Sequence, residues 1–177
     1  SIMANVEHKI SLISGIHDLL PNRTGGAVMQ KNLETLGDIQ YTEEEIKFAL
    51  EMQENNGKPK IGIDGKIRPL RETLESPGGG STDVGDVSYN VPVVSLAATT
   101  APKGVPWHSW SVVASSGMSI GHKGMLHATK ALGMTMVDIF KDENLRKQIK
   151  KEFDERIGDY KYDPFLDPGP PPIDYVD

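Results

Sequence analysis

Two stretches in the first third of the chain repeat apolar residues at the spacing of a helix. The first covers residues 24–36 and is followed by Gly37, at the position where a glycine commonly ends a helix. The second follows Thr42, which forms a capping box with Glu45 three residues later, and it extends to Asn55. These patterns predict two amphipathic helices with a short connection between them.

Two further helices are predicted towards the end of the sequence. Residues 120–140 carry the strongest helical pattern, and Asp142 then caps a charged helix that extends to about Ile157. The longer helix has an apolar face of the kind that normally packs on a core. That face is marked by Met125, Ala128, Leu132, Met136 and Ile139.

Three segments have the character of extended strands. Residues 6–15 alternate apolar and polar positions, which is typical of a half-exposed strand. Residues 91–96 form a short apolar strand in which Pro92 indicates an edge position, and residues 107–113 form a second extended piece. Helices that alternate with short strands predict an α/β layer architecture.

The remaining segments predict connections. Residues 58–75 are weakly patterned and indicate a surface excursion, and residues 76–81, Ser-Pro-Gly-Gly-Gly-Ser, indicate a flexible loop. From Asp163 onward the chain is rich in proline, which predicts an extended tail.

Composition narrows the class of protein. The 177 residues carry a formal net charge of -6, which argues against a nucleic-acid partner because phosphate binding requires a basic face. There is no cysteine, so any metal must be held by histidine, carboxylate or water. No apolar run reaches the length of a membrane span, and no signal pattern opens the sequence. We therefore expect a soluble cytoplasmic protein.

Four of the five histidines have ordinary explanations. His8 lies at a polar position of the first predicted strand, and His17 lies in a turn where a structural or incidental role is expected. His122 and His127 are five residues apart in a helix and therefore do not share a face as a metal-binding pair would. We expect these two to be surface residues or partners of a helix end.

His108 is the strongest candidate for chemistry. It lies in a loop between apolar segments, flanked by Trp107 and Trp110. Such loops commonly carry binding groups, and neighbouring aromatic rings can exclude water and so strengthen bonds to a metal or a charge. The residues alone leave a second interpretation open, a packed loop histidine bonded to a backbone carbonyl.

A second candidate region follows the glycine run at residues 78–80. Glycines with Ser81 and Thr82 could present backbone N–H groups to an anion, while Asp83 and Asp86 could bind a substrate amine or orient a metal-bound histidine. The alternative is a linker that ends in a capped turn. The phosphate-binding pattern of a P-loop is not present.

Four segments, taken in order, resemble a known family. They are LLPNRT at residues 19–24, STDVGDVS at 81–88, WHSW at 107–110 and IGHKGML at 120–126. Their order and spacing are similar to the C-terminal portion of metal-dependent amidohydrolases and exopeptidases of the p-aminobenzoyl-glutamate hydrolase type, a family that includes aminoacylases and carboxypeptidase G. The resemblance extends from about residue 6 to residue 153.

The resemblance implies a fold and a set of site residues. It implies the C-terminal half of an α/β/α catalytic domain at residues 22–160, with one strand of a lid or dimerisation domain left at residues 1–21 and a proline-rich tail at 161–177. His108 matches the histidine that supplies the last metal ligand. Asp83 matches an acid that lines the site, and with it Ser81, Thr82 and Asp86 are expected near the substrate or behind the metal ligands.

The resemblance also implies what this chain lacks. The other ligands of the two metal ions, zinc or manganese, and the catalytic glutamate precede the matched segments, so no catalytic residue is expected here. A hydrolytic metal ion typically needs three protein ligands and a water. We therefore expect part of an enzyme that cleaves N-acyl or aroyl amino acids, as a homodimer or heteromer, and no activity from this chain alone.

Two alternatives remain at this stage. The chain could be a non-catalytic module in which the glycine-rich loop and Asp83 bind a small polar ligand. It could also be a structural half that complements a separate partner, in which case its uncovered apolar surface should cause self-association.

Overall fold

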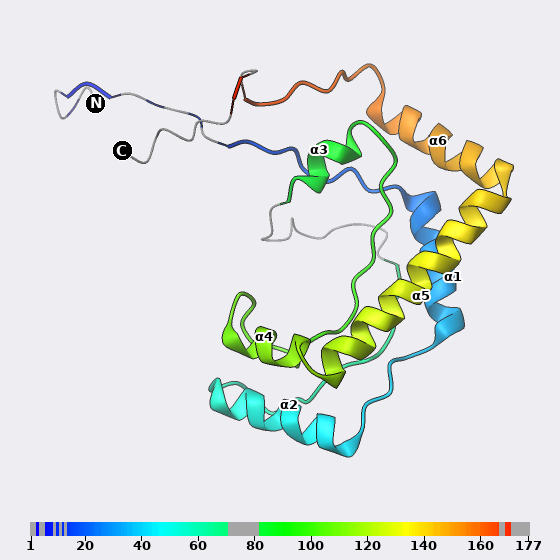
Figure 1. Cartoon of the computed structure of the whole chain (residues 1–177). Helices are drawn as coiled ribbons and strands as arrows, with labels where there is room; N and C mark the ends of the chain where they lie inside the picture. Colours follow the sequence, from blue (N-terminus) through cyan, green and yellow to red (C-terminus); the bar gives the residue numbers. More distant parts are fainter. Residues whose placement is uncertain are drawn as a thin grey trace.

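Helices account for the regular structure of this protein. The computed structural model describes residues 14–70 and 82–166, together with residues 3, 6–8, 10, 12, 169 and 170. Within these ranges the helices, shown in Figure 1, are α1 (Arg23–Leu36), α2 (Glu43–Asn55), α3 (Val84–Ser88), α4 (Trp110–Ser116), α5 (Ser119–Lys141) and α6 (Glu143–Ile157).

The four helices predicted from periodicity are confirmed as α1, α2, α5 and α6, because their ends are encoded locally. The Asn22 side chain accepts a hydrogen bond from the backbone of α1. Thr42 and Glu45 form the predicted capping box at the start of α2. Asp142 caps α6 by accepting from the Leu145 N–H at 3.0 Å. Each cap satisfies N–H groups that have no partner inside the helix.

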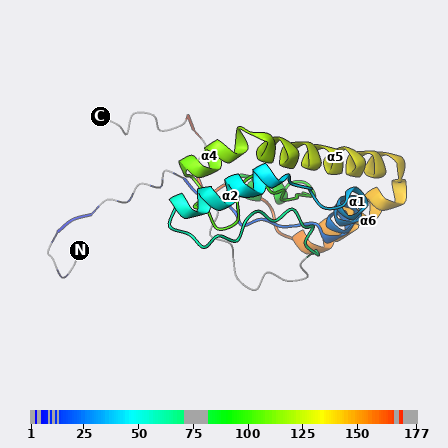
Figure 2. The same ribbon diagram turned by 90° about the horizontal axis from the view of Figure 1, so that it is seen from below.

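The helices pack around α5. It contacts α1, α4 and α6, and Figures 1 and 2 show α4 leading directly into its N-terminal end. A buried polar contact fixes α1 against α5, because the Asn32 amide donates to Thr135 Oγ1 at 3.0 Å and to Asp138 Oδ2 at 2.9 Å. The described apolar core is small: Met29, Ala49, Met52, Val105, Ile120, Ala131, Ile149 and Phe153.

The apolar face predicted for the longest helix does not pack on this core. In α5 the buried positions are Ile120, Gly121, Gly124, Ala131 and Thr135, and none of the residues that mark the predicted face is among them. The larger apolar side chains on its outer face are exposed: Met125, Leu126, Leu132, Met136, Val137 and Phe140. An α-helix that is apolar on both sides is normally covered on both.

The predicted α/β fold is wrong for the described residues, which are helical and form no strand. Of the segments predicted as strands, residues 91–96 retain a single parallel bridge, between Val93 and Pro21. No strand from a lid domain forms at the described positions of residues 6–15. Alternation marks a chain suited to a sheet, but a strand exists only where a neighbouring strand supplies its hydrogen bonds.

Residues 107–113, predicted as extended, are also different. Residues 110–116 form α4, whose first turn closes with the Val113 N–H bonded to the Ser109 carbonyl. The division at residues 21 and 160 stays a prediction. Within the part of the chain that the structure describes, no helix has the length and apolar character needed to cross a bilayer.

Candidate functional site

His108 lies in an exposed turn just before α4. Its backbone has φ 58°, the left-handed region that side chains other than glycine seldom occupy. The flanking tryptophans do not exclude water from the imidazole, because the side chains of Trp107 and Trp110 are themselves 71% and 59% exposed. The His108 side chain makes no hydrogen bond to another described residue. Both ring nitrogens are therefore accessible to a ligand from outside this part of the chain.

The second predicted region forms the short helix α3. Asp83 occupies the position before the helix and is exposed, without a capping bond from its carboxylate. The Thr82 hydroxyl accepts from the Val84 N–H at 3.3 Å. Ser81 and the glycine run at 78–80 lie outside the described residues. Figure 1 shows α3 and α4 at opposite ends of an arch, so Asp83 and His108 are not brought together.

Asp86 has a partner that the sequence did not indicate. Its Oδ1 lies 2.8 Å from Nδ1 of His17, a residue 69 positions earlier in the chain. A carboxylate can only accept, so Nδ1 donates to Asp86, and Nε2 lies 2.6 Å from the Tyr160 hydroxyl. The bond from His17 holds the pKa of Asp86 below its usual value, and the bond from Tyr162 adds to this effect.

Aromatic rings enclose the His17 imidazole, and the side chain is only 7% exposed. Phe165 stacks on it with ring centres 4.3 Å apart, and Tyr89 and Tyr162 lie at 5.0 and 5.2 Å. We call His17, Asp86, Tyr89, Tyr160, Tyr162 and Phe165 the histidine cluster. It joins three segments of the chain: the extended residues 14–20, α3 and the residues that follow α6.

Close backbone contact reinforces the histidine cluster. A side chain at Gly85 would place its Cβ 2.0 Å from the His17 carbonyl oxygen, so only glycine fits there. Ser88, which is fully buried, accepts from the Leu20 N–H at 2.8 Å. Both imidazole nitrogens already have protein partners. His17 therefore has a structural role here, because it links the segments that carry these partners, and it is not available as a general base.

A comparison with known proteins gives these segments a context. The chain is 33% identical over 157 residues to a subunit of p-aminobenzoyl-glutamate hydrolase from Escherichia coli (strain K12). The chain resembles this hydrolase subunit. The match covers 75% of this chain and 33% of the relative, so the chain spans about a third of the length of the relative that it matches. No family model matches the chain, and no solved structure matches it.

The resemblance to the hydrolase subunit agrees with the one that the motifs indicated, but the described residues do not assemble a metal centre by themselves. No group of three or more His, Asp or Glu side chains among them could hold a metal ion. His8 and His122 are exposed, and the His127 ring nitrogen bonds to the Gly37 carbonyl at 2.9 Å, as a partner of a helix end. His108 therefore offers one ligand and no more.

Sequence reasoning missed the histidine cluster because its members lie far apart along the chain. The Asp86 carboxylate was expected near a substrate or a metal-bound histidine, and that role stays a prediction; its contact with His17 was not predicted. Phe165 belongs to the predicted tail, yet it contacts His17. The one local signal was Gly85 directly before Asp86, because a glycine inside a short helix often marks close backbone approach.

Proposed function

We propose that this chain forms part of a metal-dependent amidohydrolase that cleaves the amide between an acyl or aroyl group and an amino acid, such as p-aminobenzoyl-glutamate. The observation that supports this proposal is the 33% identity, over 75% of the chain, to a subunit that is named as a hydrolase of p-aminobenzoyl-glutamate. The relative's name supplies the substrate class, and the described residues supply His108, the exposed histidine that the resemblance matches to a metal ligand.

His108 is the residue that this chain would contribute to the metal site. Its imidazole is exposed on a left-handed backbone, a conformation that is often retained at functional sites despite its cost. Because a hydrolytic zinc typically has three protein ligands, the other ligands must come from outside the described residues. A bound zinc or manganese ion would polarise the amide carbonyl and activate water.

The outer face of α5 supports assembly with further polypeptide. Phe140 is 75% exposed, and Met125 and Met136 on the same helix are also exposed. An apolar face of this size is uncommon on a protein that works alone. Because the relative is named as a subunit, we propose that a further chain of the enzyme, in a heteromer or homodimer, covers this face.

A chimera tests the proposed function. The third of the E. coli hydrolase subunit that matches this chain is replaced by this chain, and p-aminobenzoyl-glutamate hydrolysis and bound metal are measured. We expect the chimera to bind metal and turn over substrate, and the chain by itself to do neither. His108→Ala should lower metal affinity about 100-fold or more, because even residues behind the metal ligands contribute 10- to 100-fold.

A matched variant controls for folding. His122→Ala removes an exposed imidazole from α5, so the chimera should keep its metal and activity. Full metal content in the His108→Ala chimera would refute the assignment of His108. Hydrolysis by the isolated chain would show that a complete site exists among its own residues.

Assembly has its own measurement. Sedimentation of the isolated chain should show self-association that Met136→Lys reduces, since the charge disrupts the apolar face of α5. Lys130→Glu, at an exposed polar position of the same helix, is the control. A monomer over the whole concentration range would contradict an uncovered interface at this face.

A further inference from the structure

A cavity of about 510 Å³ lies between α1, residues 64–70 and residues 95–104. Its volume falls within the range of small-molecule sites, which is about 300–1,000 Å³. Trp107 reaches its rim, but His108 is not among the residues that line it. The cavity is therefore distinct from the proposed metal ligand.

Hydrogen bonds between distant segments hold the walls of the cavity. The Thr99 hydroxyl donates to the Asp64 carbonyl at 2.6 Å, and the Ile39 N–H donates to the Gly65 carbonyl at 3.0 Å. The Ile67 N–H donates to a carboxylate oxygen of Asp38 at 2.9 Å. Although the walls are not regular structure, these contacts form the cavity before any ligand arrives, which lowers the cost of binding.

The interior of the cavity is apolar on the side of α1. Met29 is almost fully buried beneath it, and Leu33 lies one helical turn further along the same helix. Leu96 contributes from the opposite wall. Leu33 and Leu96 offer a surface for a compact apolar group, which gains free energy by leaving water.

The rim of the cavity is cationic in a protein that is acidic overall. Lys66, Arg68 and Lys103 line it with a single carboxylate, Asp64, which gives a formal excess of two positive charges. The whole chain carries -6. Asp64 lies 3.5 Å from Arg68, whereas neither Lys66 nor Lys103 forms an ion pair with another described residue. Two ammonium groups beside an apolar cavity suit an anion.

We propose that this cavity binds a small organic anion with a compact apolar body, an aryl or branched alkyl carboxylate. The apolar body lies against Leu33 and Leu96, and the carboxylate lies at the rim between Lys66 and Lys103. This site needs no metal and no other chain. It therefore does not depend on the proposed hydrolase function.

Three probes separate the two parts of the recognition. Benzoate carries both the ring and the charge, benzyl alcohol carries the ring alone, and acetate carries the charge alone. Titration of the isolated chain, followed by NMR or calorimetry up to about 10 mM, should give saturable binding for benzoate and weaker binding for the other two. Added salt should weaken the binding of benzoate because the rim charges are exposed.

Variants locate the site. Lys66→Gln and Lys103→Gln should each weaken benzoate about 3-fold and the double variant about 10-fold, in line with exposed charge pairs. Leu33→Trp should block binding by filling the cavity. Lys130→Gln makes the same change of charge on α5, away from the cavity, and His108→Ala removes the proposed metal ligand. Neither should alter benzoate affinity.

Clear outcomes would overturn the proposal. Equal affinity for benzoate and benzyl alcohol would show that the cationic rim does not bind the carboxylate. Unchanged affinity for benzoate in the double lysine variant would show the same. If circular dichroism shows that the chain is folded and benzoate still does not bind saturably, the proposed site is refuted. Loss of binding in His108→Ala would show that the cavity and the proposed metal site are one.

Discussion

Gln53 and His17 both hold irregular backbone in place, at opposite ends of the arch, but with different chemistry. Gln53 is fully buried, at 0% exposed. Its amide accepts from the N–H groups of Ile61 and Gly62 at 2.9 Å and donates to the carbonyls of Gly62 and Lys103 at 2.8 Å. All four bonding positions of that amide are used. His17 instead bonds to two side chains, the carboxylate of Asp86 and the hydroxyl of Tyr160.

The difference shows how extended backbone is satisfied in this protein. At the α2 end one uncharged side chain replaces the pairing that a neighbouring strand would give to residues 61, 62 and 103. At the α3 end the extended residues 14–20 are held by side chains from two other segments, several of which are partly exposed. Local opening is favoured where contacts are few and exposed. We therefore expect the α3 end to open before the α2 end.

The largest effect should come from Gln53→Leu. The substitution keeps the volume but removes four hydrogen bonds to backbone groups, two of them buried, and each group left unpaired costs about 1–3 kcal/mol. Relaxation will recover part of this, so we expect a loss of about 3–5 kcal/mol in the free energy of unfolding, measured with urea. Gln148→Leu, at an exposed position of α6, should change stability by less than about 0.5 kcal/mol. Equal effects in both variants would remove the special role of Gln53.

His17→Phe should have a smaller and more local effect. The ring remains stackable on Phe165, but the bonds to Asp86 and Tyr160 are lost, and these partly exposed groups can turn to water. We expect a loss of about 1–2 kcal/mol. Hydrogen exchange should accelerate at the Leu20 N–H and stay unchanged at the Gly62 N–H. His122→Phe is the control at an exposed position. If His17→Phe accelerates exchange at both ends, then His17 and Gln53 do not stabilise the two ends independently.

The same comparison explains what the sequence could predict. Helices α1, α2, α5 and α6 were predictable because their hydrogen bonds and their caps, such as Asn22 and Thr42, lie within a few residues. The prediction of strands was wrong because the hydrogen-bond partners of a strand must come from another segment of the chain. The role of Gln53 could not be predicted for the same reason, since its hydrogen-bond partners lie up to 50 residues away in the sequence. A motif identified His108 as a candidate, but its left-handed backbone has no signature in the sequence.

Acid should loosen the α3 end through Asp86. The bond from His17 lowers the folded-state pKa of this carboxyl, so the unfolded chain takes up the proton first as pH falls. The stability that Asp86 contributes is therefore fully present above its ordinary pKa, about 3.9, and is lost as pH falls through the lower folded value. The protection of the Leu20 N–H against exchange, relative to an unfolded chain at the same pH, should decrease below about pH 4, and Asp86→Asn should make this protection less dependent on pH.

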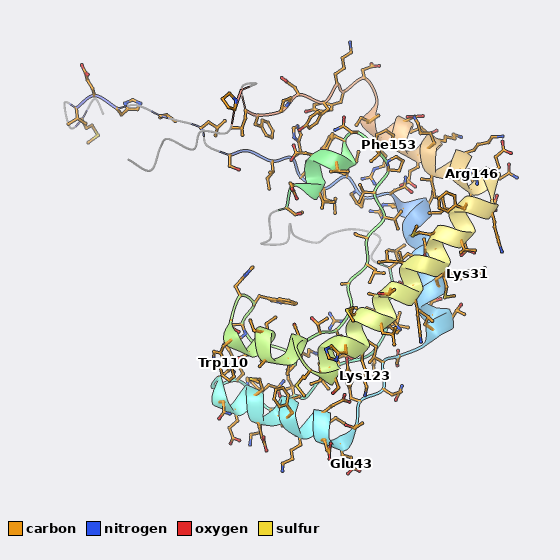
Figure 3. The ribbon with its side chains drawn as sticks, in the orientation of Figure 1. Lys31, Glu43, Trp110, Lys123, Arg146 and Phe153 are labelled. Carbon is orange, nitrogen blue, oxygen red and sulfur yellow. The ribbon has the colours of Figure 1, made fainter. Side chains whose placement is uncertain are left out.

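Glu45 provides the control at the other end of the arch. Burial alone would raise the pKa of Glu45, but the bonds from Lys123 and the Thr42 backbone outweigh it and lower that pKa to about 2. Figure 3 shows Lys123 near the N-terminal end of α5, close to α2, and its ammonium lies 2.6 Å from the Glu45 carboxylate. Asp86→Asn should leave the acid response of α2 unchanged. If it flattens both responses, the two ends are coupled.

The smallest expected effect is a gain in stability from His108→Gly. A left-handed backbone costs a non-glycine residue about 1–2 kcal/mol, and glycine removes that cost while adding about 0.5–1 kcal/mol of unfolded-state entropy. The net gain should be about 0.5 kcal/mol in urea unfolding. Gly104→Ala is the mirror experiment, because Gly104 has φ 78° and should lose stability. If His108→Gly destabilises the chain, then the imidazole makes a contact that supports the fold, and its exposed, strained position no longer favours a role in binding metal.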